Sequence, residues 1–385
     1  MATEFRRMRR ALTIMFALYC GMQLYAVAKV DAGLSLGPPV TVLLVAWAML
    51  MTAVPLLVWR WELEGRHRAV LIGAWVGYVW MGIVFVFFWI ALGIDLIRAL
   101  LAFVGPAGRW SSHESFLVAA ALTAVVSAYG FVSALRPRIE RITIDTPKLP
   151  GGDRPLRIAL ISDVHLGALI GARRLRAILD RVRELDPDVL ISAGDLVDGQ
   201  ADRLNGLAPM IAAFEPRHGK FAVTGNHEYF VGIERAIEFH RRAGFRLLQG
   251  SAAHIGGSLT IAGVDDPTGM MMGAPASTNE RSALGDAARE RFTILVKHQP
   301  LIDPRAIAHF DLQLSGHVHR GQIFPFGLLV RLSYRAPTGL SRIAGGGWLY
   351  VSRGTGTWGP PMRVGAPAEI TLIELRPAAT SQQER

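Results

Sequence analysis

The sequence predicts two parts of different fold class, an α-helical membrane region followed by a layered α/β domain. Apolar residues gather in long runs in the first third of the chain, whereas the remainder alternates short β-like runs with amphipathic helical patterns. The chain has 385 residues, 51% of them hydrophobic, so it exceeds one ordinary domain and is more apolar than a cytosolic enzyme. The third observation is a set of carboxylate, imidazole and amide side chains placed directly after several of the short runs.

The membrane region is predicted from four apolar runs, at residues 11–30, 38–59, 69–93 and 116–135. A helix needs about 20 predominantly apolar residues to cross the hydrocarbon core, and almost no charge interrupts these runs. Buried core helices are the alternative interpretation, but four such runs in succession favour a membrane. Trp and Tyr near the ends of the runs fit an interfacial belt. We therefore expect residues 1–135 to form four transmembrane helices.

The distribution of Lys and Arg predicts the orientation, because cytoplasmic loops carry an excess of both. Basic residues precede the first run, separate the second from the third and follow the fourth: Arg6, Arg7, Arg9, Arg10, Arg60, Arg66, Arg68, Arg136, Arg138 and Arg141. The opposite loops hold fewer, namely Lys29, Arg98 and Arg109, beside Asp31, Asp95 and Glu114. We expect a multi-pass protein of the cell (inner) membrane, with both termini and the α/β domain in the cytoplasm.

An export signal is the alternative for the first run, since Arg9-Arg10 precedes it as in a twin-arginine signal. Three further runs follow, and no small-residue cleavage site is obvious, so export is disfavoured. The single cysteine, Cys20, lies inside the first run and cannot form an intrachain disulfide. Cysteine usage therefore says little about the compartment.

The net charge of +10 indicates membrane lipids as partners rather than nucleic acid. Much of the excess lies in clusters beside the apolar runs, where anionic headgroups are close. A further basic run at residues 173–183 predicts a helix. That helix has either a solvated basic face or a surface that faces the bilayer or an anionic substrate.

The rest of the chain is predicted as a linker with an edge strand at residues 136–155, a domain at 156–376 and a disordered tail at 377–385. Short β-rich runs and two helical patterns alternate in the domain: strands at 156–162, 188–193, 220–224, 259–262, 292–297 and 310–315, and helices at 173–185 and 233–244. Short buried strands interleaved with amphipathic helices are typical of layered α/β packing.

Five short motifs in this domain carry the chemistry, and each follows a predicted strand, where such folds assemble sites. The motifs are Asp163-Val164-His165, Gly194-Asp195, Gly225-Asn226-His227-Glu228, Lys297-His298 and Gly316-His317-Val318-His319. Each is weak evidence alone, since any of these residues could cap a helix or close a turn. Together they provide enough carboxylate, imidazole and amide ligands for two metal ions.

Two divalent cations roughly 3.5–4 Å apart can clamp a phosphate and activate water for in-line attack. A ligand shared between them should be a carboxylate, and Asp195 is the candidate. Imidazoles suit Mn, Fe or Zn, whereas the mixed set argues against Ca and against a structural zinc site, which would prefer cysteines. The motifs therefore predict a metal-dependent phosphoric ester hydrolase.

As an ordered set, these motifs resemble those of the calcineurin-like metallophosphoesterases, whose pattern is D-x-H, G-D, G-N-H-[DE], H and G-H-x-H. The resemblance covers residues 156–375, and the apolar runs with the stretch 358–363 resemble the membrane-attached bacterial branch of that family. It implies a β-sandwich of two mixed sheets flanked by helices.

The resemblance also implies roles for individual residues. The first metal would be held by Asp163, His165 and His319, and the second by Asn226, His298 and His317, with Asp195 bridging both. His227 would bind no metal and would instead contact the phosphate and assist the leaving group. His227 and Asp195 are thus the predicted catalytic residues.

Other polar residues have two interpretations. Asp198, Glu228, Asp265 and Asp266 could orient ligands or could serve as caps and turns. The pair His317 and His319 alternates, so on an extended segment both side chains would point to one face. His218, His240, His254 and His309 match no motif.

The apolar segment 323–349, with Arg331, Arg335 and Arg342 interspersed, predicts either a hairpin packed on the core or a membrane-facing flap beside the site. We therefore favour a lipid-linked substrate, and the resembling branch includes hydrolysis of UDP-2,3-diacylglucosamine in lipid A biosynthesis. A nucleotide or general phosphodiesterase is one alternative. A catalytically silent membrane scaffold or sensor is the other, which the complete ligand set and His227 disfavour.

Overall fold

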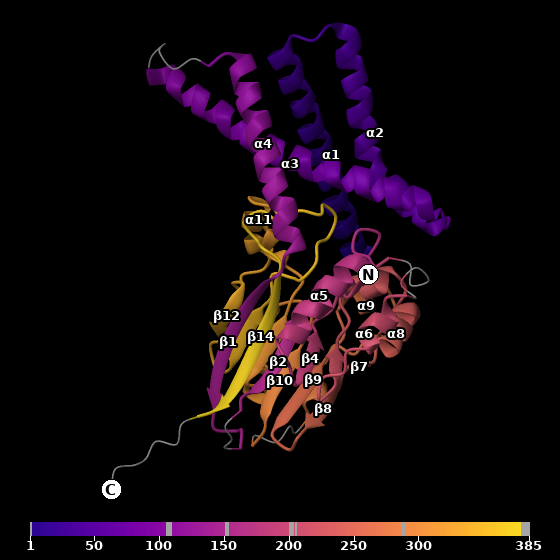
Figure 1. Cartoon of the computed structure of the whole chain (residues 1–385), viewed down its shortest axis with the longest axis vertical. Helices are drawn as coiled ribbons and strands as arrows, with labels where there is room; N and C mark the ends of the chain where they lie inside the picture. The colour runs from indigo at the N-terminus through magenta and orange to yellow at the C-terminus, as the bar shows by residue number, and fades with distance from the viewer. Residues whose placement is uncertain are drawn as a thin grey trace. The chain divides into compact units, whose positions relative to one another are not determined.

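The computed structural model describes residues 2–104, 110–150, 154–199, 204, 206–285 and 290–378. The chain divides into two compact units (Figure 1). The helix unit comprises Met1–Ser133 with Gly359–Val364, and the α/β unit comprises Ala134–Trp358 with Gly365–Arg385. Of the predicted disordered tail, residues 379–385 lie outside the described residues, and Pro377 ends a strand.

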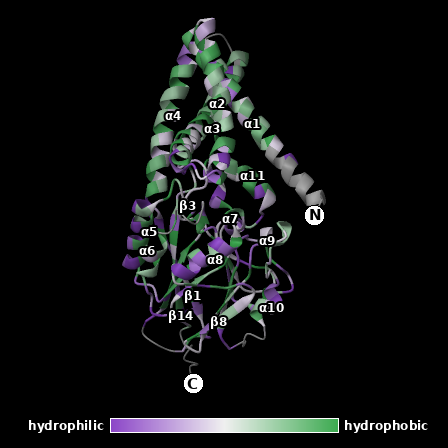
Figure 2. Cartoon of the chain, turned by 90° about the vertical axis from the view of Figure 1, so that its right-hand side faces the viewer, coloured by the Kyte–Doolittle hydropathy of each residue, from purple (hydrophilic) through white to green (hydrophobic). Residues whose placement is uncertain are grey.

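Four long apolar helices make up most of the helix unit: α1 (Ala2–Leu34), α2 (Pro38–Leu63), α3 (His67–Val104) and α4 (Ser112–Leu135). All four are long and apolar enough to cross a membrane, which confirms the four predicted helices. Figure 2 shows apolar residues along most of their length. Large side chains such as Leu43 and Ile72 are about two-thirds exposed, at 69% and 66%. Lipid tails solvate such surfaces as readily as a protein interior does, so this is a membrane protein.

Polar side chains inside the helix unit are paired with one another. Lys29 and Asp95 lie within α1 and α3 rather than in loops, and Lys29 Nζ is 2.7 Å from Asp95 Oδ1. The Tyr25 hydroxyl donates to Asp95 Oδ2 at 2.6 Å. Pairing of this kind explains how charges are tolerated in apolar helices, because an unpaired charge there is costly.

The segment Gly359–Val364 packs among the helices of the helix unit. Met362 is fully buried, and the Arg363 amide donates to the Gly130 carbonyl of α4 at 2.9 Å. A Cβ added at Gly82 of α3 would lie 2.9 Å from Met362 Sδ, and one at Gly130 would lie 3.0 Å from Val364 Cγ2. The two glycines therefore provide the space that this segment occupies.

Two six-stranded sheets form most of the α/β unit, beside a two-stranded sheet of β3 (Leu166–Gly167) and β5 (Val197–Asp198). The first has the order β1-β14-β2-β4-β6-β7, with β1 (Arg138–Thr146), β14 (Glu369–Pro377), β2 (Leu156–Ile161), β4 (Val189–Ser192), β6 (Lys220–Ala222) and β7 (Phe245–Leu247). The second has the order β12-β13-β11-β10-β9-β8, with β12 (Gly339–Arg342), β13 (Trp348–Val351), β11 (Leu312–Ser315), β10 (Phe292–Val296), β9 (Leu259–Gly263) and β8 (Ser251–Ile255). Each sheet mixes parallel and antiparallel pairs, since β14 is antiparallel to β2, and β8 to β9.

The sheets pack face to face around one apolar core, in which Ile158 and Ile191 of the first sheet meet Ile261 and Ile294 of the second. Helices cover both outer faces. On the first sheet these are α5 (Ala172–Glu184), α6 (Ala208–Ala212) and α8 (Ile233–Arg242); beside the second lie α10 (Glu280–Leu284) and α11 (Phe326–Ser333). This is the predicted sandwich of two mixed sheets flanked by helices, and the fold class is confirmed.

Helix α5 contains the basic run. Its apolar side chains Leu175, Ile178 and Val182 are buried against the first sheet at helical spacing. On the other face, Arg181 pairs with Glu184 at 3.0 Å and Arg183 with Asp180 at 2.8 Å, both exposed. These two arginines therefore lie on a solvated helix face.

We predict that Gly82→Leu will lower the melting temperature of the full-length protein in detergent, because the new side chain occupies the place of Met362. Overpacking of this kind costs roughly 1–3 kcal/mol. Gly93→Leu, also in α3, is the matched control, since nothing lies within 4 Å of a Cβ there. Equal melting temperatures for the two variants would contradict the packing of Gly359–Val364 described here.

Candidate metal centre

The five motifs converge at one edge of the sandwich. In the first sheet the parallel strands β2, β4 and β6 are neighbours, and their carboxyl ends lead to Asp163, Asp195 and Asn226. In the second sheet β10 and β11 are parallel neighbours and lead to His298 and His317. Carboxyl ends of parallel strands meet at one edge, so ligands distant in sequence become adjacent.

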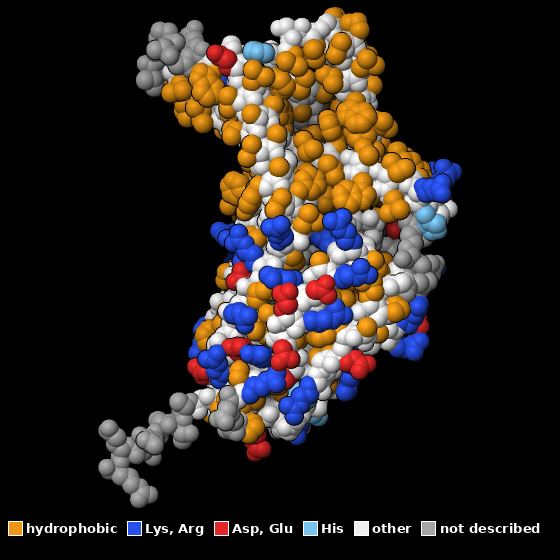
Figure 3. Space-filling view, in the orientation of Figure 1, with side chains coloured by type: hydrophobic (Ala, Val, Ile, Leu, Met, Phe, Trp, Pro, Cys, Tyr) orange, Lys and Arg blue, Asp and Glu red, His pale blue; other side chains and the backbone are white. Residues whose placement is uncertain are grey.

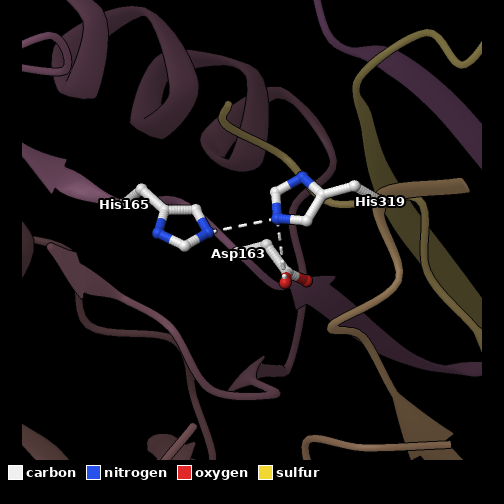
Figure 4. A group of neighbouring side chains, drawn as sticks. All are labelled: Asp163, His165 and His319. Carbon is white, nitrogen blue, oxygen red and sulfur yellow. Dashed lines mark hydrogen bonds and ion pairs between the residues drawn. The ribbon is translucent and has the colours of Figure 1, made fainter. Parts of the chain in front are cut away.

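One group consists of Asp163, His165 and His319 (Figure 4). His319 Nε2 lies 3.3 Å from Asp163 Oδ1 and 3.1 Å from His165 Nε2. All three side chains are buried. Two imidazole nitrogens and a carboxylate oxygen thus converge on one point.

The second group consists of Asp195, His298 and His317. His298 Nε2 lies 3.1 Å from Asp195 Oδ2 and 3.2 Å from His317 Nδ1. Asn226 Oδ1 lies 3.0 Å from the same His317 nitrogen. Asp195 Oδ2 is also 3.8 Å from His165 Nε2, so one carboxylate borders both groups.

The donor chemistry of these groups fits two divalent metals. Two pairs of imidazole nitrogens face each other at 3.1 and 3.2 Å, an arrangement that needs a shared proton or a cation. Burial and the neighbouring His298 lower the pKa of His317 to about 4, which keeps its ring neutral, as a metal ligand must be. Burial alone would raise the pKa of Asp163, but the nearby histidines hold it well below its usual range. The mixed nitrogen and oxygen set suits Mn, Fe or Zn.

The backbone at this site is strained. Of the nine non-glycine residues with positive φ among the described residues, five are predicted ligands: Asp163, His165, Asp195, His317 and His319, at 53°, 54°, 50°, 71° and 47°. Such conformations cost about 1–3 kcal/mol each and gather at functional sites. The prediction of an extended segment with both histidines on one face is wrong. His317 joins the second group, whereas His319 begins the 3₁₀ helix η4 (His319–Gly321) and joins the first.

Glu228 holds the loop that carries Asp195. The Glu228 carboxylate is fully buried and accepts hydrogen bonds from the backbone N–H groups of Asp195, Leu196 and Gly225, at 3.0, 2.9 and 2.7 Å. It lies in α7 (Asn226–Phe230), whose first turn it caps. Glu228 therefore serves both as a cap and as a positioning residue, two interpretations that the sequence left open.

Asp198 hydrogen-bonds one histidine and lies near a second. His227 Nδ1 lies 2.8 Å from Asp198 Oδ1, and His165 Nδ1 lies 3.4 Å from Asp198 Oδ2. Burial alone would lower the pKa of His227, but the charges of Asp198 and Asp195 raise it to about 9. The ring is therefore protonated at neutral pH. His227 also lies close enough to His165 and Asp195 for the three to share a metal, an arrangement that the sequence interpretation did not include.

Asp266 has a more remote positioning role. Its carboxylate accepts from Gln299 Nε2 at 3.0 Å, Gln299 Oε1 accepts from the Tyr334 hydroxyl at 3.2 Å, and the Tyr334 ring lies 5.2 Å from that of His317. Asp265 instead accepts from Thr224 Oγ1 at 2.9 Å and ties two loops together. Four histidines match none of the five motifs: His218, His240, His254 and His309. Among the described residues, the groups able to hold a metal include none of them.

Three aromatic residues that the sequence analysis did not assign to the metal centre lie beside it. The rings of Phe230 and Trp358 lie 5.3 and 6.0 Å from the His227 ring, and that of Tyr334 borders His317. The segment before Trp358 lies on the Asp163 loop, where the Gly356 amide donates to the Asp163 carbonyl at 3.0 Å. A Cβ at Gly356 would overlap the Val164 carbonyl, so this approach requires glycine. The position of these rings depends on contacts between distant segments, which no local pattern reveals.

This combination of fold and buried His/Asp groups defines a metal-dependent phosphoesterase. Residues 156–321 match the model of the family described as calcineurin-like phosphoesterase. A metallophosphoesterase of Aquifex aeolicus is 39% identical over 256 residues, which are 66% of this chain and 98% of that protein. A transmembrane protein with metallophosphoesterase domain from Danio rerio is 35% identical, over 69% of this chain and 64% of that protein. A Helicobacter pylori metallophosphoesterase is 36% identical, over 64% of this chain and 66% of that protein.

The chain belongs to the calcineurin-like metallophosphoesterase family. The predicted enzyme class, a metal-dependent phosphoric ester hydrolase, is confirmed by the family and by the His/Asp groups together.

We predict that Glu228→Gln will destabilise the protein and weaken metal binding, because an amide NH₂ would face backbone N–H donors. An unsatisfied buried donor costs about 1–3 kcal/mol. The measurements are the melting temperature in detergent and the number of Mn ions bound per chain. Glu234→Gln is the matched control on the exposed face of α8 and should change stability by less than about 0.5 kcal/mol. Equal effects of the two substitutions would contradict the role of Glu228.

Proposed function

We propose that this chain is a membrane-anchored phosphoesterase with two metals that cleaves a phosphodiester or pyrophosphate bond. The observation that carries the proposal is the pair of His/Asp groups that both border Asp195. In this proposal Asp163, His165 and His319 hold one ion, Asn226, His298 and His317 hold the other, and Asp195 bridges them. Two divalent ions, Mn, Fe or Zn, would polarise the phosphate and supply a nucleophile from water.

The chain's own residues then handle the leaving group. Asp198 engages His227 Nδ1, which leaves the Nε2–H as the atom able to donate a proton. The raised pKa of His227 supports a general acid, because the ring holds its proton at neutral pH. The His227 backbone N–H also donates to Asp195 Oδ1 at 2.9 Å, so acid and bridging ligand are fixed to each other.

We favour a lipid-linked substrate on the cytoplasmic side, such as UDP-2,3-diacylglucosamine in lipid A biosynthesis. The four membrane helices support a substrate located in a bilayer, and the arginines beside them support the cytoplasmic side. Phe230 and Trp358 beside His227 are about half exposed, at 55% and 49%, which suits an amphipathic ligand. A soluble nucleotide or general phosphodiester would use the same metals but would gain nothing from membrane anchoring.

A silent scaffold or sensor is the remaining alternative. It would have no need of a protonated His227 held by the Asp198 carboxylate, nor of five ligands in strained conformations. Both features favour catalysis.

We predict that substituting the metal ligand His317 and substituting the general acid His227 will have different effects on metal content and activity. His317→Ala should bind one metal fewer and lose activity, whereas His227→Ala should keep two metals and lose roughly 10²–10⁴-fold in kcat. His254→Ala, on the exposed surface of β8, is the control and should match the wild type. Metal content by mass spectrometry and turnover of bis-p-nitrophenyl phosphate are the measurements. A His227→Ala variant with one metal would instead make His227 a ligand.

We predict that Asp198→Asn will move the alkaline limb of the kcat profile to lower pH. The general acid is active while protonated, so kcat falls as pH rises through the pKa of His227. The Asp198 charge raises that pKa, and its removal should lower it by about 1–3 units. Metal content measured in parallel serves as the control. An unchanged alkaline limb at full metal content would contradict the role of the pair.

The substrate class is tested by assaying the full-length protein in detergent with Mn against UDP-2,3-diacylglucosamine and bis-p-nitrophenyl phosphate in parallel. We expect the lipid-linked substrate to have the higher kcat/KM. Activity on the soluble diester alone would remove the lipid-linked assignment and leave the hydrolase. Turnover of neither substrate, with two metals bound, would support the silent scaffold.

A further inference from the structure

Exposed apolar side chains of the α/β unit gather in the segments that follow the metal-centre motifs. Beyond residue 136, the large apolar side chains that are exposed among the described residues are Phe230, Met270, Met271, Met272, Leu301, Ile302, Phe324, Phe326, Leu328, Leu329, Leu332 and Trp358. We call this set the apolar collar. On the face of the α/β unit seen in Figure 3, Lys and Arg lie among Asp and Glu, with apolar side chains scattered between them.

Contacts tie the collar segments to the centre. Phe230 and Trp358 border the His227 ring, and Leu301 lies three residues after His298. Met270 and Met271 lie in α9 (Thr268–Met271), which follows Asp266 and packs on α7, where a Cβ at Gly269 would lie 2.5 Å from the Tyr229 ring. Phe230 and Trp358 therefore border the centre directly, and the other collar segments follow its motifs along the chain.

Helix α11 is the largest part of the collar. It follows His319 by way of η4 and ends beside Tyr334, which contacts His317. None of its residues is buried. Leu332 is 79% exposed, and Leu328 and Leu329 lie on the same side of the helix, one turn earlier. Val330 packs against the core beside the second sheet, but an eight-residue apolar helix without a fully buried side chain suits an interfacial element.

Basic side chains accompany the apolar ones. Arg320 and Arg335 flank α11, Arg331 lies on it, and all three are exposed. None of them forms an ion pair with another described residue. Apolar side chains beside unpaired arginines complement an anionic lipid surface, in which acyl chains lie beneath phosphate headgroups.

We propose that the apolar collar rests on the bilayer that anchors the chain, with its apolar side chains among the acyl chains and the three arginines at anionic headgroups. The four membrane helices favour lipid over a second protein as the occupant, because they keep the α/β unit at a membrane. The consequence for catalysis rests on the proposed function. The metal centre would open onto the lipid surface and receive phosphoesters without their leaving the leaflet.

The direct test is depth-dependent quenching in the full-length chain. In a Cys20→Ser background, Leu332→Cys or Glu184→Cys carries an environment-sensitive fluorophore, and the protein is placed in phosphatidylcholine–phosphatidylglycerol nanodiscs with or without spin-labelled lipid. Glu184 is an exposed control at the carboxyl end of α5. It lies near the amino end of β4, whereas the metal centre lies at the carboxyl ends of the strands. We expect quenching at 332 and not at 184. Absence of quenching at 332 would overturn the proposal.

The second arm measures the consequence. A triple variant, Leu328→Ser, Leu329→Ser and Leu332→Ser, should lower kcat/KM for a vesicle-embedded lipid phosphoester by about tenfold or more, a loss of about 1.4 kcal/mol. Its turnover of bis-p-nitrophenyl phosphate should not change. An equal loss on both substrates would indicate damage to the site and would overturn the consequence for catalysis. If the wild type hydrolyses neither substrate, the proposed function fails, while the quenching result still decides where the collar lies.

Discussion

The carboxylate of Asp195 is the interaction on which both halves of the metal centre depend. It lies 3.1 Å from His298 and 3.8 Å from His165, which belong to different groups and follow strands of different sheets. Its position is fixed through the backbone: its own N–H donates to Glu228, and its Oδ1 accepts from the His227 N–H. A side chain at Gly225 would overlap Asp195, so the approach of these two loops requires glycine. The sandwich brings the loops of both sheets to one edge, and the Asp195 carboxylate lies between the two His/Asp groups that they carry.

The strain in the ligand backbones is offset by hydrogen bonds between loops. The Asp163 amide donates to the Gly194 carbonyl and the His165 amide to the Asp195 carbonyl, both at 3.0 Å. These bonds align the first two motifs with each other. The loops hold carboxylates and imidazoles close together, at a free-energy cost that divalent cations would relieve. The same closeness raises the pKa of His227 and lowers that of Asp163, because each lies beside groups of opposite charge.

Much of the fold was predictable because its signals are local. Apolar runs predict the membrane helices, and short β-rich runs predict β2, β4, β6, β9, β10 and β11 within about two residues. The C-terminal strand β14, which pairs with both β1 and β2, depends on contacts between chain ends that no window contains. The left-handed turns at His317 and His319, the glycine-lined place of Met362 and the double contact of Asp198 likewise arise from tertiary packing. The alternation of His317 and His319 alone predicted an extended segment, whereas tertiary contacts impose turns at both residues.

The central claim is that one carboxylate joins two metals. Electron paramagnetic resonance of the Mn-loaded full-length protein tests it most directly, combined with metal counting. A shared carboxylate should give two Mn per chain with an exchange-coupled spectrum, as expected for ions about 3.5–4 Å apart, and Asp195→Ala should abolish the coupling. One Mn per chain, or two with independent signals, would contradict the account.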